Sequence, residues 1–483
     1  MFNLFDSRKS ASESPLFLHD SATGEKRLFT PLKSKVVSMY SCGPTVYNHI
    51  HIGNLRAYLL PDILKRTLLY LGYEVKHTIN FTDFGHLTDD ADTGEDKIMK
   101  GMKREGYEIT IDNMKKFALP YIESFKADNE QFGNIPATDY TRATDFVTEQ
   151  VKLIETLSEK GYTYETTDGI YYEVAKFNNY GQLGNINLGA LRASARMEEN
   201  SEKRHPADFA LWKKSDLGFK SKWGTGFPGW HIECTAMAFA TLGKQIDIHT
   251  GGEDLMYTHH NGEIAQAESV TGKKFSQFWL HNAHVTAGEE KLAKSAGNGF
   301  TLQDLTDKGF STFDYRYWLL QGHYRTRMDF SFKALEAARQ ALSRLRKLVY
   351  IELDDQPISE PDAAYIRDFS SALLDDLDTP KVIATLWHIT KDKNLSSSAK
   401  LSTIKVIDSV LNIGLSLDAQ EGKSKLGFVD LSSLPQNIKE VLAERETARN
   451  DGNWEKSDQL REDLVQLGYS IKDTPEGTVV TKV

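Results

Sequence analysis

Residues 35–81 read KVVSMYSCGPTVYNHIHIGNLRAYLLPDILKRTLLYLGYEVKHTINF, and this stretch decides the fold. Lys35–Ser41 is a short apolar run that predicts a buried strand ending at the Gly43-Pro44 turn. Leu55–Leu71 then places apolar side chains at helical spacing, and Val75–Phe81 is a second predicted strand. A strand, a helix and a strand in this order predict a parallel α/β sheet, with chemistry at the carboxyl ends of its strands.

The remaining sequence extends this α/β pattern and adds further domains. A second α/β stretch is predicted, with a strand at Gln245–His249 and a helix from Thr258 to Val270. Gly85–Gly94 is rich in Asp, Gly and Thr, which predicts an exposed loop. The predicted organisation is 1–135 as the first half of a catalytic domain, 136–223 as an inserted connective subdomain, 224–330 as the second half of the catalytic domain, 331–425 as a helical domain and 426–483 as a small C-terminal domain.

Length and composition bound the class of protein. A chain of 483 residues is too long for one core, so about two to four domains are expected. With 40% hydrophobic and 26% charged residues it resembles a soluble globular protein, and its apolar runs are too short to span a bilayer. The N-terminal residues lack the continuous apolar stretch of a signal peptide, so a cytoplasmic location is expected. A net charge of −10 argues only weakly against a nucleic-acid partner, because binding depends on where the basic residues lie.

The two cysteines, Cys42 and Cys234, cannot form a disulfide framework in so long a chain, so we expect them to be free or metal-bound. His259 and Glu263 project from one face of a predicted helix, and His260 lies about a quarter turn away, so one histidine of the pair is expected to join a metal half-site. Two thiolates, an imidazole and a carboxylate suit zinc by ligand type. The alternative is that both cysteines are buried apolar residues and that the helix face is solvated.

A nucleotide site is predicted from two separate segments. His51-Ile52-Gly53-Asn54 opens a helix directly after a strand and a turn, so its N–H groups can bind phosphate and Gly53 permits close approach. His49 or His51 could donate to charge on an α-phosphate. Far downstream, Lys291 and Lys294 lie before a glycine-rich segment and could offset the charge of a triphosphate. The alternatives are helix capping by the histidines and a solvated turn at the lysines; no P-loop is present, so a kinase-type site is not expected.

These segments together resemble the cysteinyl-tRNA synthetase family over nearly the whole chain. His51–Asn54 and Lys291-Leu292-Ala293-Lys294-Ser295 are similar to the HIGH and KMSKS motifs of class I synthetases. The other stretches that carry the resemblance are Cys42–Tyr47, Arg142–Thr144, Asp208–Lys213, Gly229–Cys234, Asp247–Gly252, His323–Arg325, Asp375–Pro380 and Asp473–Thr478.

The resemblance implies a Rossmann-like class I catalytic domain with an insertion, then a helical domain and a small anticodon-binding domain. It implies one zinc ion per chain, bound by Cys42, Cys234, His259 and Glu263. Catalytic roles are implied for His51, Asn54, Lys291 and Lys294. Residues implied to bind cysteine or ATP are Gly43, Thr45, Gly53, Thr82, Trp230, His231, Gly251, Gly252, Asp254 and Lys294.

The sequence departs from the family pattern at four places. Ala293 replaces the usual serine between the two lysines, and Asn48-His49-Ile50 differs from the usual residues before the HIGH-like motif. Asn261-Gly262 replaces a more acidic pair, which is expected to loosen that helical turn. About ten residues, Gly85–Gly94, are inserted after Thr82-Asp83-Phe84, so local geometry there is open.

The expected activity is ATP-dependent formation of cysteinyl-adenylate, with Mg²⁺, followed by transfer of cysteine to the 3′ end of tRNA(Cys). We expect a monomer with no membrane partner, and RNA contacts from Arg445, Arg449 and Arg461, whose alternative is a solvated helix face. One competing interpretation is a ligase that passes activated cysteine to a small amine, as in the related mycothiol-pathway ligase. Another is a catalytically silent RNA-binding or regulatory paralogue.

Overall fold

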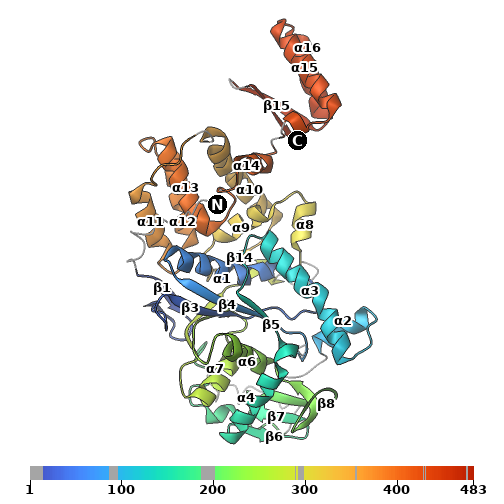
Figure 1. Cartoon of the computed structure of the whole chain (residues 1–483), viewed down its shortest axis with the longest axis vertical. Helices are drawn as coiled ribbons and strands as arrows, with labels where there is room; N and C mark the ends of the chain where they lie inside the picture. The colour runs from blue at the N-terminus through green and yellow to red at the C-terminus, as the bar shows by residue number, and fades with distance from the viewer. Residues whose placement is uncertain are drawn as a thin grey trace. The chain divides into compact units, whose positions relative to one another are not determined.

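The structure is a computed structural model that describes residues 15–85, 96–186, 202–288, 290–291, 299–353, 356–427, 429, 431–474 and 477–482. Its chain divides into two compact units (Figure 1). The first comprises Met1–Leu335 and Arg367–Ile383, and the second comprises Glu336–Ile366 and Ala384–Val483. Within the described ranges, no helix is long and apolar enough to cross a membrane.

The first unit is built on a five-stranded parallel sheet, which confirms the predicted α/β fold. From β3 the chain proceeds to β4 and β5, then crosses to β10 and β11 on the other side. The strand order therefore reverses between β3 and β10, the place where open α/β sheets bind ligands. The strands in spatial order are β11 (Ser276–Asn282), β10 (Ile246–Gly252), β3 (Val36–Ser41), β4 (Glu74–Phe81) and β5 (Asp139–Arg142).

Helices cover both faces of this sheet, with α1 on one side and α6 and α7 on the other (Figure 1). The helix α1 (Ile52–Tyr70) joins β3 to β4, and its Tyr58 packs edge-on against Phe125 of α3 (Ile111–Gln131). Val37 and Met39 of β3 are fully buried, as expected for a strand between two helical layers. The other helices here are α2 (Lys97–Arg104), α4 (Val147–Glu159), α6 (Trp230–Thr241) and α7 (His259–Thr271).

A second, antiparallel sheet interrupts the first and corresponds to the predicted insertion. Its own core includes Tyr172, Leu211 and Trp212, all fully buried. The strand β5 pairs with β4 in the central sheet, whereas β9 pairs with β8 in this second sheet. The strands are β6 (Thr163–Glu165), β7 (Gly169–Tyr172), β8 (Phe209–Ser221) and β9 (Gly224–Pro228).

Short elements complete the first unit. The strand β12 (Val285–Ala287) pairs with β13 (Glu290–Lys291) and with β14 (Met328–Asp329), which lies some forty residues downstream. Of the part of the chain that the structure describes between β13 and β14, two segments are α-helical: α8 (Leu302–Asp307) and α9 (Thr312–Leu320). An N-terminal hairpin consists of β1 (Phe17–Asp20) and β2 (Glu25–Leu28).

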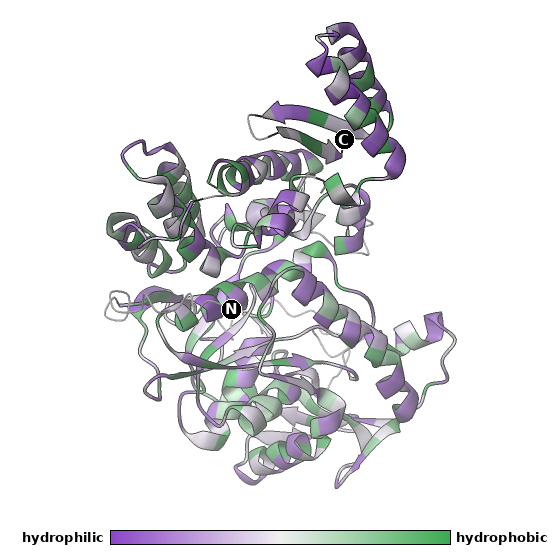
Figure 2. Cartoon of the chain, turned by 45° about the horizontal axis from the view of Figure 1, so that its top comes forward, coloured by the Kyte–Doolittle hydropathy of each residue, from purple (hydrophilic) through white to green (hydrophobic). Residues whose placement is uncertain are grey.

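The chain beyond residue 331 is helical until a final hairpin, as the sequence predicts. The hairpin packs with α15 and α16 around a small core of Leu434, Ile438, Leu464, Ile471 and Val480. In Figure 2 these two helices, at the upper right, are predominantly hydrophilic. The elements are α10 (Phe332–Lys347), a π-helical turn (Leu348–Glu352), α11 (Ala363–Leu373), α12 (Thr379–Lys391), α13 (Ser397–Leu411), α14 (Ala419–Lys425), α15 (Gln436–Asn450), α16 (Trp454–Gln466), β15 (Tyr469–Thr474) and β16 (Gly477–Lys482).

Candidate active site and metal centre

Cys42 follows the last residue of β3, at the point where the strand order reverses. Its backbone N–H donates to the carbonyl of Thr250 at the end of β10, at 3.2 Å, so the two strand ends are joined directly above the switch point. The next residue, Gly43, donates its N–H to Asn80 Oδ1 at 2.9 Å. A Cβ at position 43 would lie 1.5 Å from the carbonyl oxygen of Asn80, so only glycine fits this turn.

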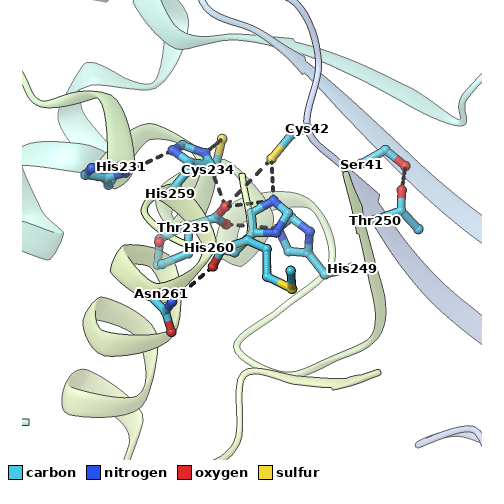
Figure 3. Close-up of polar contacts among 12 residues, drawn as sticks. Ser41, Cys42, His231, Cys234, Thr235, His249, Thr250, His259, His260 and Asn261 are labelled. Atoms are coloured by element: carbon cyan, nitrogen blue, oxygen red, sulfur yellow. Dashed lines mark hydrogen bonds and ion pairs between the residues drawn. The ribbon is translucent and has the colours of Figure 1, made fainter. Parts of the chain in front are cut away.

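The four predicted metal ligands meet at one place. Cys234 comes from α6, and His259 and Glu263 come from successive turns of α7, which packs beside α6. His259 Nε2 lies 3.3 Å from Cys234 Sγ and 3.2 Å from Glu263 Oε1, and Cys42 Sγ lies 3.7 Å from that same oxygen. All four donor atoms lie within 4.8 Å of one another. Figure 3 shows Cys42, Cys234 and His259 of this set side by side. The grouping predicted from residue types is therefore present in the fold.

The chemistry of this donor set fits zinc. Burial raises the pKa of the Cys234 thiol to about 11 and raises that of Cys42 well above its ordinary value. Among the residues that the structure describes, the ion-pair partners of the fully buried Glu263 are histidines, with no lysine or arginine near it. A buried carboxylate beside two thiols needs a compensating cation, and a divalent metal supplies it.

Two further histidines join the cluster. His260 Nε2 lies 3.3 Å from Cys42 Sγ, and His249 Nε2 lies 2.9 Å from Glu263 Oε2. Cys42, His249, His260 and Glu263 thus form a second set of donors within 4.8 Å. Each set contains one histidine of the 259–260 pair, His259 in the first and His260 in the second. The helix α7 is buried all round here, so His259 faces α6 while His260 faces the sheet.

No role was predicted for His249, although the sequence holds a signal for one. His249 lies on β10, whose residues Ile246–Gly252 are all buried. A titratable residue inside such a strand is unusual, because burying a polar group costs free energy unless it is bonded. Its ring also stacks on Trp279, with centroids 4.3 Å apart.

A cavity of about 380 Å³ opens beside Cys42 and is lined by most of the residues that were predicted to bind the nucleotide. Its wall includes the start of α1 and the loop that precedes it, which fits the predicted phosphate site at a helix N-terminus. On the opposite side the wall includes Asn282, His284 and Val285, which were not predicted. The predicted residues in its lining are Cys42, Gly43, Thr45, His49, His51, Gly53, Asn54, Gly252 and Asp254.

The histidines at this cavity have defined partners. Asn54 Oδ1 accepts from the backbone N–H of His51 at 3.0 Å, so Asn54 fixes the start of α1. His49 Nδ1 lies 2.7 Å from Ser124 Oγ, which turns its ring toward α3. The structure thus brings both predicted imidazoles to the cavity, and His284 Nε2 adds another, 3.6 Å from Asp254 Oδ1.

The predicted cysteine-pocket residues surround the metal donors. Trp230 stacks on His259 with ring centroids 4.3 Å apart, and His231 Nδ1 lies 2.9 Å from His259 Nδ1. The second contact leaves His259 Nε2 directed at the thiols. Thr82 Oγ1 donates to Glu233 Oε1 at 2.8 Å. A Cβ at Gly251 would lie 2.6 Å from His260 Cε1, so this glycine makes room for that ring.

The departures from the family pattern have different outcomes. At Asn261-Gly262, where a looser turn was expected, Asn261 is buried and binds Leu183 through both ends of its amide, at 3.2 and 3.0 Å. A Cβ at Gly262 would lie 3.0 Å from His231 Cγ, so glycine accommodates that ring. Lys294, Ala293 and residues 86–94 of the insertion lie outside the described residues, as does the side chain of Lys291.

The sequence and the fold of this chain are both similar to those of known proteins. Two family models match the chain: the class I (C) tRNA synthetase catalytic domain over residues 28–340, and the cysteinyl-tRNA ligase anticodon binding domain over residues 431–480. Two structures of Mycobacterium tuberculosis methionyl-tRNA synthetase with methionyl-adenylate share the fold, with TM-scores of 0.53 and 0.56 at 13% and 12% identity; they cover 83% and 85% of this chain and 95% and 96% of theirs. The protein is thus a class I aminoacyl-tRNA synthetase.

Sequence relatives narrow this class. The cysteine–tRNA ligase of Treponema denticola is 37% identical, with 97% of this chain and 100% of the relative covered. Cysteine–tRNA ligase 1 of Burkholderia lata is 40% identical, with 96% of each covered. The chain therefore belongs to the cysteinyl-tRNA synthetase family and is an aminoacyl-tRNA ligase.

Proposed function

We propose that this enzyme uses ATP to activate L-cysteine as cysteinyl-adenylate and then transfers cysteine to the 3′ end of tRNA(Cys). The observation that carries the proposal is the cluster of Cys42, Cys234, His259 and Glu263 beside the cavity at the switch point. Relatives that cover nearly the full chain and are named cysteine–tRNA ligase support it.

We assign one zinc ion per chain to these four ligands. When bound, zinc lowers the pKa of a substrate thiol and binds its thiolate, whereas the alcohol of serine stays protonated and is a poor ligand. Cysteine and serine are near-isosteres that a pocket separates only weakly by shape, so this selection makes an editing domain unnecessary. We propose that Glu263 is the ligand that the substrate sulfur replaces. Its second carboxylate oxygen, Oε2, already lies 2.9 Å from His249 Nε2, which can retain the carboxylate.

Adenylate formation needs positioning and charge stabilisation, with no nucleophile from the protein. The carboxylate of cysteine attacks the α-phosphate of ATP, the bond to the β-phosphate breaks, and pyrophosphate leaves with Mg²⁺. His51 and Gly53, at the start of α1, line the cavity in which these phosphates would lie. In the same turn the N–H groups of Ile52 and Asn54 donate to the carbonyls of Phe300 and His51. Lys291 and Lys294 are proposed to stabilise the departing pyrophosphate, and Gly252 and Asp254 to contact the adenylate.

Transfer to tRNA is proposed to use the rest of the chain, with 331–425 as a helical tRNA-binding domain and 426–483 as an anticodon-binding domain. Of the three arginines predicted to contact RNA, Arg445 is 5% exposed and binds Asp473 through two hydrogen bonds of 3.0 and 2.7 Å. Arg445 therefore stabilises the fold of this domain, and we no longer propose it as an RNA contact. Arg449 also contacts Asp473, but its side chain is 34% exposed, so Arg449 and Arg461 remain the proposed phosphate contacts. The strength of such contacts falls with salt.

The experiment is cysteine-dependent ATP–pyrophosphate exchange, run beside aminoacylation of a tRNA(Cys) transcript, with and without a zinc chelator. We expect both activities with cysteine, neither with serine, and loss of both after chelation. Activity with serine, or full activity after verified removal of zinc, would contradict the assigned role of the cluster.

The same pair of assays separates the two competing interpretations. Exchange without charging supports a ligase with a small amine acceptor, and silence in both assays supports a regulatory paralogue. The match over residues 431–480 to an anticodon binding domain favours the tRNA acceptor, because a small amine requires no such domain.

A further inference from the structure

Arg56 is a buried cation that forms no ion pair among the described residues, although Glu253 attracts it electrostatically. It lies on α1, two residues after Asn54, and is 3% exposed. Its Nη2 donates to the carbonyl oxygens of His323 at 3.0 Å and of Thr326 at 2.5 Å, while its Nε has no partner. Burial lowers the pKa of its guanidinium to about 10. Burying a guanidinium costs free energy. Its hydrogen bonds to backbone carbonyls therefore indicate that Arg56 fixes the backbone segment that carries them.

The carbonyls that Arg56 binds belong to the segment 323–326, which supports the far wall of the nucleotide cavity. Tyr324 O accepts from the N–H of Ala283 at 2.9 Å and also faces Arg56 Nη2 at 3.4 Å. The chain continues into β14, which pairs with β12. Asn282, the last residue of β11, and His284 and Val285, at the start of β12, line the cavity together with the N-terminus of α1.

Asp376 contacts the side chains of the same segment. Its carboxylate accepts from Tyr324 Oη at 2.6 Å and from Arg325 Nε at 2.9 Å, and its carbonyl lies 2.9 Å from His323 Nε2. Asp376 and Leu377 both have positive φ angles, of 61° and 55°, a conformation that non-glycine residues adopt at a cost. The segment 323–326 is therefore held by two residues, by Arg56 through the backbone of the segment and by Asp376 through its side chains.

From these contacts we infer that Arg56 is a positioning residue for adenylate formation, and this inference rests on the proposed function. Arg56 is absent from the described lining of the cavity, so it acts through the backbone. It fixes the distance between the α1 N-terminus, which binds phosphate, and the wall formed by Asn282, His284 and Val285. Losing that link displaces one wall against the other without removing any group that touches ATP.

The test is Arg56→Met, which keeps the length of the side chain and removes its donors. We expect the kcat of cysteine-dependent ATP–pyrophosphate exchange to fall roughly 100-fold, since misplacement of about 1 Å costs that much. Zinc content and the KM for cysteine should stay at wild-type values. Arg56→Lys keeps the charge and can reach fewer carbonyls, so an intermediate kcat is expected.

Tyr70→Phe is the matched control on the same helix. It removes the bond of 3.1 Å between Tyr70 Oη and Ser370 Oγ, which lies away from the segment 323–326. We expect its kcat to stay within about twofold of wild type, with a stability loss of the size ordinary for one hydrogen bond. If Arg56→Met lowers kcat no more than Tyr70→Phe does, Arg56 is only structural and the inference fails.

A double-mutant cycle with His284→Ala supplies a readout that simple destabilisation does not change. If Arg56 acts by placing the wall that carries His284, the losses in kcat should be strongly non-additive. Full additivity overturns the inference, and the cycle can be run with Arg56→Lys if the methionine variant does not fold. An inactive wild type would instead refute the proposed function, so the two failures are distinguishable.

Discussion

At the scale of single residues, Cys234 tests the proposal that a bound zinc ion selects the substrate thiol. Its Sγ lies 3.3 Å from His259 Nε2 inside a buried cluster. We predict that Cys234→Ser abolishes tight zinc binding and cysteine-dependent pyrophosphate exchange together, because a serine hydroxyl stays protonated and is a poor zinc ligand. Zinc content by mass spectrometry and the exchange rate check this. Normal exchange in a zinc-free variant would refute the mechanism.

Thr235→Ala is the neighbouring control for that substitution. Thr235 Oγ1 donates to Gln266 Oε1 at 2.7 Å, so the variant breaks one buried hydrogen bond between α6 and α7 and leaves the donor set intact. We expect it to keep its zinc and to lose about 1 kcal/mol of stability. Loss of zinc here too would show that the packing of α6 on α7, and not the thiol, controls metal binding.

How far the site could be predicted differs residue by residue. His259 and Glu263 could be paired because one helical turn separates them, and Cys42 because it ends an obvious strand. His249 and His260 could not be placed, since their contacts depend on β10 lying beside β3 and on α7 being buried on every side. Neither condition is local, so the second set of donors follows only from the tertiary fold.

At the scale of elements, the pair β3 and β4 with α1 was predictable because a short apolar run, apolar residues at helical spacing and a second strand pattern follow one another directly in the sequence. The strand β5 was not, because Asp139–Arg142 is short and polar and joins the sheet only by pairing with β4. Contacts between helices that are distant in the sequence were equally unpredictable. Arg316 of α9 binds Asp62 of α1 from far along the chain, and no sequence pattern connects them.

The contact of Arg316 with Asp62 predicts a large loss of stability on its removal. Both side chains are buried, and Arg66 of α1 shares the carboxylate at 2.9 Å. Arg316→Met leaves the buried carboxylate with one partner fewer, so we expect a loss of roughly 3 to 5 kcal/mol in the free energy of unfolding. Urea denaturation measures it. A loss below that of an exposed pair, such as Lys126→Ala beside Glu123, would show that the contact contributes nothing.

The same contact predicts how stability depends on pH. Burial alone would raise the pKa of Asp62, but Arg316 and Arg66 outweigh it and lower that pKa below its ordinary value of 3.8. The unfolded chain therefore binds the proton more tightly than the folded one, so the contribution is present above pH 4 and is lost as the pH falls below the ordinary carboxyl range. In urea titrations at several pH values, Arg316→Met should show a weaker loss of stability on acidification than wild type does.

At the scale of the whole molecule, activation and tRNA recognition should be separable by mutation. The C-terminal core of Leu434, Ile438, Leu464, Ile471 and Val480 is small and shares no residue with the cluster at Cys42. Leu464 is fully buried, and Leu464→Ala should cost about 2 to 5 kcal/mol, enough to unfold so small a core. We predict that tRNA charging then falls steeply while pyrophosphate exchange keeps its wild-type rate.

Leu467→Ala is the matched control, because this leucine lies one turn further on and is 47% exposed. It should leave both activities unchanged, since an exposed leucine contributes little to the core. Raising the salt concentration should weaken charging by the wild type and spare exchange, because only the RNA contacts release counterions. If Leu464→Ala lowers exchange as much as charging, adenylate formation depends on the C-terminal domain, and the proposed division of labour is wrong.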